Sequence, residues 1–205
     1  MEPAIISPPR IWTTDEAKKI VSMIDLMDID VNCRKPIVRD KFQALMRATV
    51  ALWAYTGCRN KAVMTLERSN IHEISPTETV LVFRERKTGK VSTIPMHKRL
   101  LLELENVRRL FPSSKRLIPW HIQYRAISKH HEKMVRDAEL PKSAQNPPKY
   151  WRKWFANALE VAGYKPLQSL AQGMLNHSSP ETTSRYYSNA ASVVIPFIPD
   201  IFETE

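Results

Sequence analysis

Four short segments of the chain carry side chains that could do chemistry on a phosphate. The first is Thr56-Gly57-Cys58-Arg59, in which a helix stops at glycine and an arginine opens the next helix. An arginine beside a helix N-terminus adds its bidentate guanidinium to unpaired backbone N–H groups, and this combination binds phosphate well. Taken alone, the segment is explained better as a surface arginine that follows an ordinary helix end.

Two further segments are basic. Lys87-Thr88-Gly89-Lys90 is expected to form the turn of a β-hairpin, and a lysine on such a turn can reach into a DNA groove or protonate a leaving oxygen. Lys149 and Arg152 are three residues apart, so on a helix they point the same way. Both pairs could equally be solvated basic surface. The apolar residues of that helix form a separate stripe that should face the core: Trp151, Phe155, Leu159 and Ala162.

The fourth segment contains a histidine and a tyrosine. His177 follows Leu175-Asn176, and Tyr186 comes nine residues after His177. The residues between them read as a turn and a new helix start. Neither residue is a strong signal by itself, because buried histidines are mostly structural and Tyr-Tyr pairs often lie in cores.

The order of these residues is more specific than any one of them. Arg, Lys, Lys-x-x-Arg, His and Tyr follow one another along the chain, and this order resembles the signature of the tyrosine recombinases of the phage-integrase family. That signature is usually Arg, Lys, His-x-x-Arg, His or Trp, and Tyr. The resemblance extends over about Thr13 to Tyr187. Further segments that resemble the family are Thr-Gly-x-Arg at 56–59, Leu66 to Ile71, Ile94-Pro95, Asn176-His177 and Thr182-Thr183-x-x-Tyr186.

Several residues depart from the family pattern. Lys149 stands where histidine is usual, although lysine occurs there in some members and in type IB topoisomerases. Ala62 stands where an acidic residue is usual, three positions after Arg59. Asn176 replaces a glycine, and asparagine tolerates the left-handed backbone that the turn needs. Tyr187 adjoins Tyr186, and only the spacing from His177 favours the first tyrosine as the nucleophile.

The resemblance implies DNA cleavage and rejoining without a metal or other cofactor. Tyr186 would attack the phosphate to form a 3′-phosphotyrosine that keeps the bond energy for rejoining. Lys87 would protonate the leaving 5′-oxygen. Arg59 and Arg152 would clamp the scissile phosphate, each donor contributing about 3 kcal/mol to transition-state stabilisation. His177 would donate a further hydrogen bond to that phosphate, and Lys149 would complete the catalytic set as a phosphate contact that does not shuttle protons. Lys90 would contact the DNA. His130-His131-Glu132 is not expected to hold zinc, because adjacent helical residues point about 100° apart.

These residues must be positioned by a mostly helical domain. The sequence predicts an α+β fold, mostly α with a small antiparallel sheet, and the resemblance specifies it as the tyrosine recombinase catalytic-domain fold. The one clear β signal is Thr79–Phe83 and Val91–Ile94 on either side of the basic turn. A capping box at Thr13 to Glu16 marks the first helix. Further helices are expected at 38–55, 59–67, 97–111, 122–138, 148–162, 167–175 and 180–189.

The expected domain organisation has three parts. Residues 1–12 form an extended lead-in, residues 13–189 the catalytic domain and residues 190–205 a C-terminal tail. The tail contains the apolar run Val193 to Pro199. The tail could pack on its own domain, but the resemblance favours docking on a neighbouring protomer. Family members usually carry an N-terminal helical domain that clamps the other face of the DNA, whereas this catalytic domain starts almost at Met1.

Composition bounds the partners and the compartment. The chain has 205 residues, with 31 Lys and Arg against 21 Asp and Glu, a net charge of +10. Such an excess favours a polyanionic partner, because each neutralised phosphate releases counterions. No apolar stretch approaches the ~20 residues that span a bilayer, and no secretion signal is evident. Cys33 and Cys58 give no disulfide framework. We therefore expect a cytoplasmic protein.

Together these features predict an integrase-like, site-specific recombinase that acts on double-stranded DNA. The resemblance implies a homo-oligomer, a tetramer on DNA, with a free chain that could be monomeric. Two alternatives stay open: a type IB topoisomerase, which shares the catalytic arrangement, and a DNA-binding relative that has lost activity. The sequence does not specify the target site or the choice among integration, excision, resolution and transposition.

Overall fold

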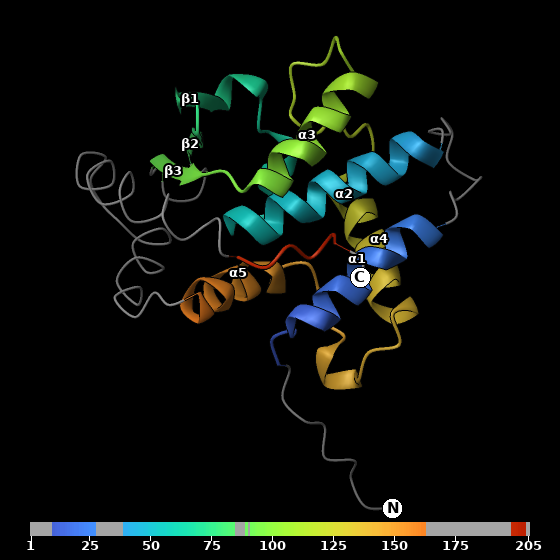
Figure 1. Cartoon of the computed structure of the whole chain (residues 1–205). Coiled ribbons are helices and arrows are strands. Elements are labelled where there is room, and N and C mark those ends of the chain that lie inside the picture. The colour runs from blue at the N-terminus through green and yellow to red at the C-terminus, as the bar shows by residue number, and fades with distance from the viewer. Residues whose placement is uncertain (1–9, 28–38, 85–88, 90, 163–197, 204–205) are drawn as a thin grey trace, which may run out of the picture.

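The computed structural model describes residues 10–27, 39–84, 89, 91–162 and 198–203. Within these ranges the chain forms five α-helices and one three-stranded antiparallel sheet, which confirms the predicted α+β class (Figure 1). The α-helices are α1 (Thr14–Leu26), α2 (Arg39–Thr56), α3 (Lys98–Leu110), α4 (Tyr124–Asp137) and α5 (Tyr150–Val161). The strands are β1 (Ile71–Ser75), β2 (Glu78–Arg84) and β3 (Val91–Pro95), and short 3₁₀ helices are η1 (Asn60–Met64), η2 (Arg68–Asn70) and η3 (Lys142–Ala144).

Helix α2 is the central element, and α1, α3 and α5 all pack against it (Figure 1). Thirteen of its 18 residues are buried, among them Trp53 and Tyr55 near its C-terminus. The hydroxyl groups of its buried threonines form hydrogen bonds within this apolar environment. Thr49 donates to the Leu45 carbonyl at 2.7 Å and accepts a hydrogen bond from Trp120 Nε1 at 2.8 Å. Central burial of this kind fixes the position of the segment that follows Thr56.

The first helix begins as its capping box predicts. Thr13 Oγ1 accepts from the Glu16 amide at 3.2 Å, and the Glu16 carboxylate accepts from the Thr13 amide at 3.0 Å. Arg10 donates to the same carboxylate at 2.7 Å, and this hydrogen bond is the main cause that holds the Glu16 pKa below its usual value. The start of α1 is therefore stabilised from both sides of the cap.

The sheet confirms the predicted hairpin and adds a strand that the sequence did not reveal. Strands β2 and β3 pair in register, with Leu81 opposite Ile94 and Arg84 opposite Val91. Strand β1 pairs with β2 as an edge strand, and all but its first residue are exposed. Because no face of β1 is buried, its sequence has no alternation of apolar and polar residues to mark it.

The remaining helix predictions had different outcomes. The helix expected at 59–67 is a 3₁₀ helix at Asn60–Met64, after which Glu67 forms an isolated bridge with Arg116. The helices expected at 167–175 and 180–189 lie outside the described residues. The apolar stripe predicted on α5 does face the core, since Trp151, Phe155 and Leu159 are all buried.

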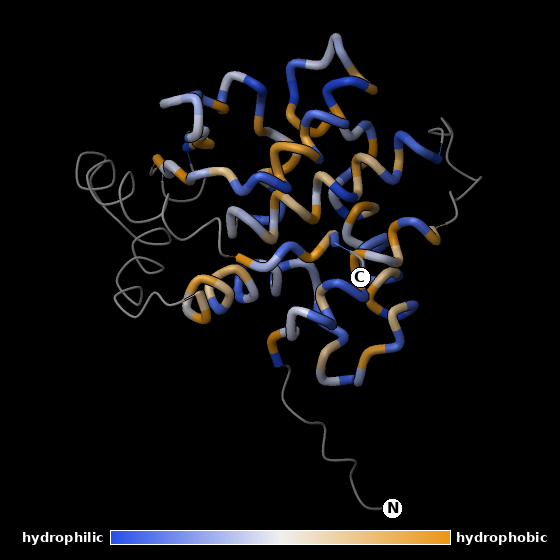
Figure 2. Tube along the Cα trace, viewed as in Figure 1, coloured by the Kyte–Doolittle hydropathy of each residue, from blue (hydrophilic) through white to orange (hydrophobic). Residues whose placement is uncertain are grey.

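Apolar and polar residues are interspersed along the helices (Figure 2), which gives each helix a buried and an exposed side. The core contains the indoles of Trp12, Trp53, Trp151 and Trp154. No helix within the described ranges is both long and apolar enough to cross a membrane.

Candidate active site

Arg59 lies at the turn that ends α2. Gly57 adopts a left-handed conformation with φ +57°, and its amide donates to the Trp53 carbonyl at 3.1 Å. The Cys58 amide donates to Thr56 Oγ1 at 3.2 Å. Arg59 then caps η1, and its carbonyl accepts from the Ala62 amide at 2.7 Å. The predicted helix-glycine-arginine-helix arrangement is confirmed, with a half-buried Arg59 at the start of η1.

Arg152 lies in the first turn of α5 and is also half-buried. Trp151 and Phe155 lie before and after Arg152 in this helix and are almost fully buried, so they anchor the first turn of α5 in the core. Lys149 precedes the helix and is exposed. The start of α5 is a tight turn, in which the amides of Tyr150 and Trp151 donate to the carbonyls of Pro147 and Pro148 at 3.0 and 3.1 Å.

The two arginine segments meet where α5 packs on the end of α2. A Cβ atom at Gly57 would lie 2.5 Å from Phe155 Cδ1, which is closer than real Cβ contacts. Glycine is therefore required at 57 both by its backbone angle and by the approach of the Phe155 ring. Arg59 follows this contact by two residues, and Arg152 precedes it by about one helical turn. The packing brings two cationic segments, 93 positions apart in sequence (152 minus 59), to one end of α2.

Four predicted site residues, Lys87, Lys90, His177 and Tyr186, lie outside the described residues. Their roles stay predictions. The hairpin that would carry the two lysines is described on either side of them. Gly89 has φ +69°, and its carbonyl accepts a hydrogen bond from Arg84 Nη1 at 3.0 Å.

The histidines of α4 are engaged in packing. His131 is fully buried, accepts a hydrogen bond from Trp151 Nε1 and has a pKa lowered to about 3 by burial. His130 packs edge-on against Phe42, with ring centroids 4.8 Å apart. Among the residues that the structure describes, no three His, Cys, Asp or Glu side chains are grouped as a metal site would need.

The sequence did not single out Phe155, Trp53 or His131 as residues that shape the site. The one usable signal was Gly57, since a glycine two residues before a candidate arginine can permit a close approach. Which ring makes that approach depends on the tertiary packing of α5.

Comparison with known proteins agrees with this architecture. No protein-family model matches the chain. No curated protein matches it either. Among solved structures, the integrase of mycobacterium phage Brujita aligns with 100% of this chain at 18% identity and a TM-score of 0.65. XerH site-specific recombinase bound to its difH substrate aligns with 87% at 18% identity and a TM-score of 0.61. A lambda integrase dimer bound to a COC′ core site aligns with 92% at 18% identity and a TM-score of 0.61.

The fold is therefore that of the tyrosine recombinase catalytic domain, as the sequence resemblance predicted. The match extends over nearly all of this chain but over only part of the other chains. This chain spans 50% of the XerH chain, 62% of the Brujita integrase and 63% of the lambda integrase fragment.

Proposed function

We propose that this chain is the DNA-cleaving and rejoining domain of a site-specific recombinase, with Tyr186 as the nucleophile. The observation that carries the proposal is the packing of α5 on the end of α2, in which Phe155 lies against Gly57. This contact joins the segments of Arg59 and Arg152 within a fold shared with XerH and lambda integrase. Two guanidinium groups at one end of a helix suit a shared phosphate ligand.

The proposed reaction is a balanced exchange of phosphate esters. The Tyr186 hydroxyl releases its proton to water and attacks the phosphorus, forming a 3′-phosphotyrosine as the bond to the 5′-oxygen breaks. Lys87 supplies the proton that the leaving 5′-oxygen takes up. Arg59, Arg152 and His177 offset the charge that grows on the non-bridging oxygens. A 5′-hydroxyl from a partner strand then reverses the step and releases the tyrosine. Lys149 and Lys90 bind neighbouring phosphates.

Double-stranded DNA is the proposed partner, and a tetramer on DNA the proposed working form. A net charge of +10 favours binding to polyanions. The lambda integrase of similar fold has been solved as a dimer on a core site and as a tetramer on a Holliday junction. We expect the protein to act in the cytoplasm, where nucleoid or host DNA is available. Because binding would rest on contacts with phosphates, the affinity for DNA should fall steeply as the salt concentration rises. Mobility shifts across a salt series test this, and tight binding that ignores salt would contradict it.

Covalent trapping tests the chemistry. The full chain is incubated in EDTA with a nicked suicide substrate from its own genetic element, and SDS-resistant complexes are separated on a gel. Wild type and the Tyr187→Phe variant should form the complex, whereas Tyr186→Phe should not. Loss of the complex only in Tyr187→Phe would move the nucleophile by one residue. Complexes from neither wild type nor the two variants, despite clear binding, would refute the proposal and support a DNA-binding protein without activity.

A type IB topoisomerase is the second candidate, because Lys149 occupies a position where that class also has lysine. The two activities differ in whether strands pass between duplexes. A recombinase joins strands from two different labelled duplexes, whereas a topoisomerase only relaxes a supercoiled circle. Relaxation without any joining of the two labelled duplexes would favour the topoisomerase.

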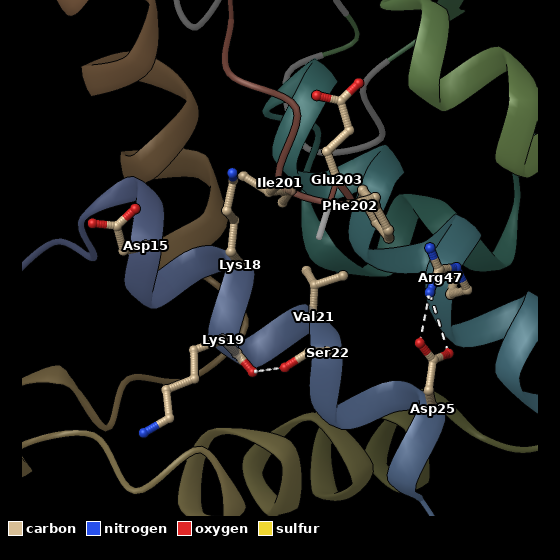
Figure 3. Close-up of a pocket in the computed structure, with 10 residues that line it drawn as sticks. All are labelled: Asp15, Lys18, Lys19, Val21, Ser22, Asp25, Arg47, Ile201, Phe202 and Glu203. Carbon is tan, nitrogen blue, oxygen red and sulfur yellow. Dashed lines mark hydrogen bonds and ion pairs between the residues drawn. The ribbon is translucent and has the colours of Figure 1, made fainter. Parts of the chain in front are cut away.

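The C-terminal segment is proposed to dock on a neighbouring protomer during assembly. In this chain Ile198 and Ile201 are buried, and the Ile201 amide donates to Tyr55 Oη at 3.0 Å. Arg99 Nε donates to the Asp200 carboxylate at 2.8 Å. Figure 3 shows the groove of about 540 Å³ between this segment and α1, with Phe202 beside Arg47. The surface that this segment occupies would accept the equivalent segment of a second copy.

Deletion of the residues after Asn189 tests the docking. If the segment joins protomers, the truncated protein should form fewer oligomers on DNA in sedimentation. The Asp200→Asn variant, which removes the ion pair with Arg99 and weakens the contacts with Tyr55 and the Phe202 amide, should show a smaller effect in the same direction. Unchanged assembly of the truncated protein would show that the segment packs only on its own domain.

A further inference from the structure

His131 is a fully buried histidine that the proposed chemistry does not use. Its Nε2 accepts a hydrogen bond from Trp151 Nε1 at 2.8 Å. Because Nε2 is the acceptor, a neutral ring carries its proton on Nδ1. Nδ1 has no hydrogen-bond partner among the described residues. A buried N–H without a partner destabilises a fold, so a histidine retained here invites a reason beyond packing.

The ring of His131 contacts two tryptophans that are each linked to the segment of a site arginine. The edge of His131 meets Trp53, with ring centroids 5.8 Å apart and planes at 78°. Trp53 Nε1 in turn donates to the Asn60 carbonyl at 3.2 Å, and Asn60 directly follows Arg59. On the other side, Trp151 directly precedes Arg152. A continuous set of contacts therefore runs from Asn60 through Trp53, His131 and Trp151 to the turn that carries Arg152.

We infer that His131 is a positioning residue, which together with Trp53 and Trp151 sets the separation of Arg59 and Arg152 so that both can bind one scissile phosphate. The inference rests on the proposed function, because it presumes that the two arginines share a phosphate. His131 lies on α4, whereas the tryptophans lie on α2 and α5. The histidine thus joins the two arginine-bearing elements through a third.

An acceptor, and not only a ring, is needed at position 131. A phenyl ring would fill nearly the same volume but would leave the Trp151 indole N–H buried without a partner. That N–H would seek another acceptor, and the Trp151 ring would turn with it. Because Arg152 adjoins Trp151 at the first turn of α5, a rotation of the indole would displace the guanidinium. A displacement of about 1 Å at a reacting centre can lower a rate by about 100-fold.

Three variants of neighbouring residues separate these effects. His131→Phe keeps a ring and removes the acceptor. His131→Gln keeps an acceptor where Nε2 was, because the amide oxygen of glutamine reaches that position. His130→Phe is the matched control, since it makes the same change one position away, in a residue that packs on Phe42. Circular dichroism and thermal unfolding would establish that each variant is folded before its cleavage rate is compared.

Each variant is tested on two suicide substrates that differ only at the scissile phosphate. One carries the natural phosphodiester, and the other a methylphosphonate, which has no charge and needs less help from a pair of guanidinium groups. His131→Phe should cleave the phosphodiester about 10- to 100-fold more slowly than wild type and the methylphosphonate within about threefold of its rate. His131→Gln should recover most of the phosphodiester rate, and His130→Phe should match wild type.

An equal loss on both substrates would overturn the inference, because it would show a general packing role for His131. An unchanged phosphodiester rate in a folded His131→Phe protein would overturn it too. If His131→Phe does not fold, Trp53→Phe replaces it, since this change keeps an aromatic ring but removes the hydrogen bond to Asn60 along with part of the indole ring, and it should alter the substrate ratio in the same way. The proposed function is tested separately by Arg59→Ala. If that variant cleaves the phosphodiester as fast as wild type, the proposed function fails, whatever the His131 variants show.

Discussion

At the scale of single residues, Gly57 connects the backbone of one element to the side chain of another. Its φ of +57° ends α2, and its missing Cβ admits the Phe155 ring. The sequence pointed to the first property, because glycine commonly ends helices. It gave no sign of the second, since nothing local specifies which residue of α5 will reach position 57. Arg59 owes its place to both.

The Gly57→Ala change should destabilise the fold and reduce cleavage. The new methyl group would meet Phe155 and occupy a left-handed backbone, at a cost of about 2–4 kcal/mol in the free energy of unfolding. Urea denaturation at neutral pH measures this cost. Gly89→Ala is the matched control, because Gly89 has φ +69° but no atom within 4 Å of an added Cβ. It should lose only about 1 kcal/mol. Equal losses would contradict the proposed contact with Phe155.

His131 should also make stability depend on pH. Burial lowers its pKa from 6.5 to about 3, so the folded state holds the neutral ring while the unfolded state takes up a proton below pH 6.5. This contribution is complete above pH 6.5 and decreases as the pH falls toward 3. Between pH 7 and pH 5 the free energy of unfolding should decrease by about 2 kcal/mol. His97, whose pKa burial also lowers, acts in the same direction.

The His131→Gln variant isolates this contribution, because glutamine does not titrate. Its free energy of unfolding, measured in urea at pH 7 and pH 5, should change less with pH than that of wild type. The change contributed by His97 should remain in both proteins. A variant that loses as much stability as wild type between the two pH values would show that His131 is not the group responsible.

At the scale of elements, the sequence predicted well wherever periodicity was strong. The helices α1 to α5 and the β2–β3 hairpin were all anticipated within a few residues. Strand β1 was missed because it is an exposed edge strand, stabilised by backbone pairing with β2 and not by burial. The segment after Arg59 was expected to be an ordinary helix and is a 3₁₀ helix of five residues. Propensity does not separate these two over so short a length.

The surface that binds the C-terminal segment could not be predicted either, because it is formed by residues far apart in the sequence. Tyr55 on α2 and Arg99 on α3 both contact Asp200. Burial opposes the charge on Asp200, but hydrogen bonds from the Phe202 amide and from Arg99 outweigh it and lower its pKa. The segment is thus held by polar contacts as well as by the burial of Ile198 and Ile201.

The Tyr55→Phe change should loosen this segment without unfolding the domain. It removes the hydroxyl that accepts a hydrogen bond from the Ile201 amide, a contact whose loss costs about 1 kcal/mol. Hydrogen–deuterium exchange should show faster exchange across residues 198–203, while α2 retains its protection. Faster exchange in both segments would point to a general packing defect, and unchanged exchange at 198–203 would show that the hydroxyl does not hold the segment.

At the scale of the whole molecule, the charge and the fold are both consistent with the proposed function. The excess of ten positive charges favours a polyanionic partner, and the fold is the one found in XerH and lambda integrase. The ordered set of Arg, Lys, Lys-x-x-Arg, His and Tyr predicted this fold from single residues spread over the chain. The structure describes the parts that carry Arg59, Lys149 and Arg152. The catalytic roles of these three residues, like those of Lys87, His177 and Tyr186, stay predictions that chemistry must test.

We would first determine which residue carries a nucleotide after cleavage. Complexes formed in EDTA on a suicide substrate are denatured, digested with nuclease and protease, and sequenced by mass spectrometry. We expect a nucleotide adduct on Tyr186 and none on Tyr187. The same adduct should be absent from Arg59→Ala and Arg152→Ala proteins that still bind DNA, because both arginines are proposed to hold the reacting phosphate. An adduct on a residue other than Tyr186, or one that forms equally well without either arginine, would contradict the proposed site.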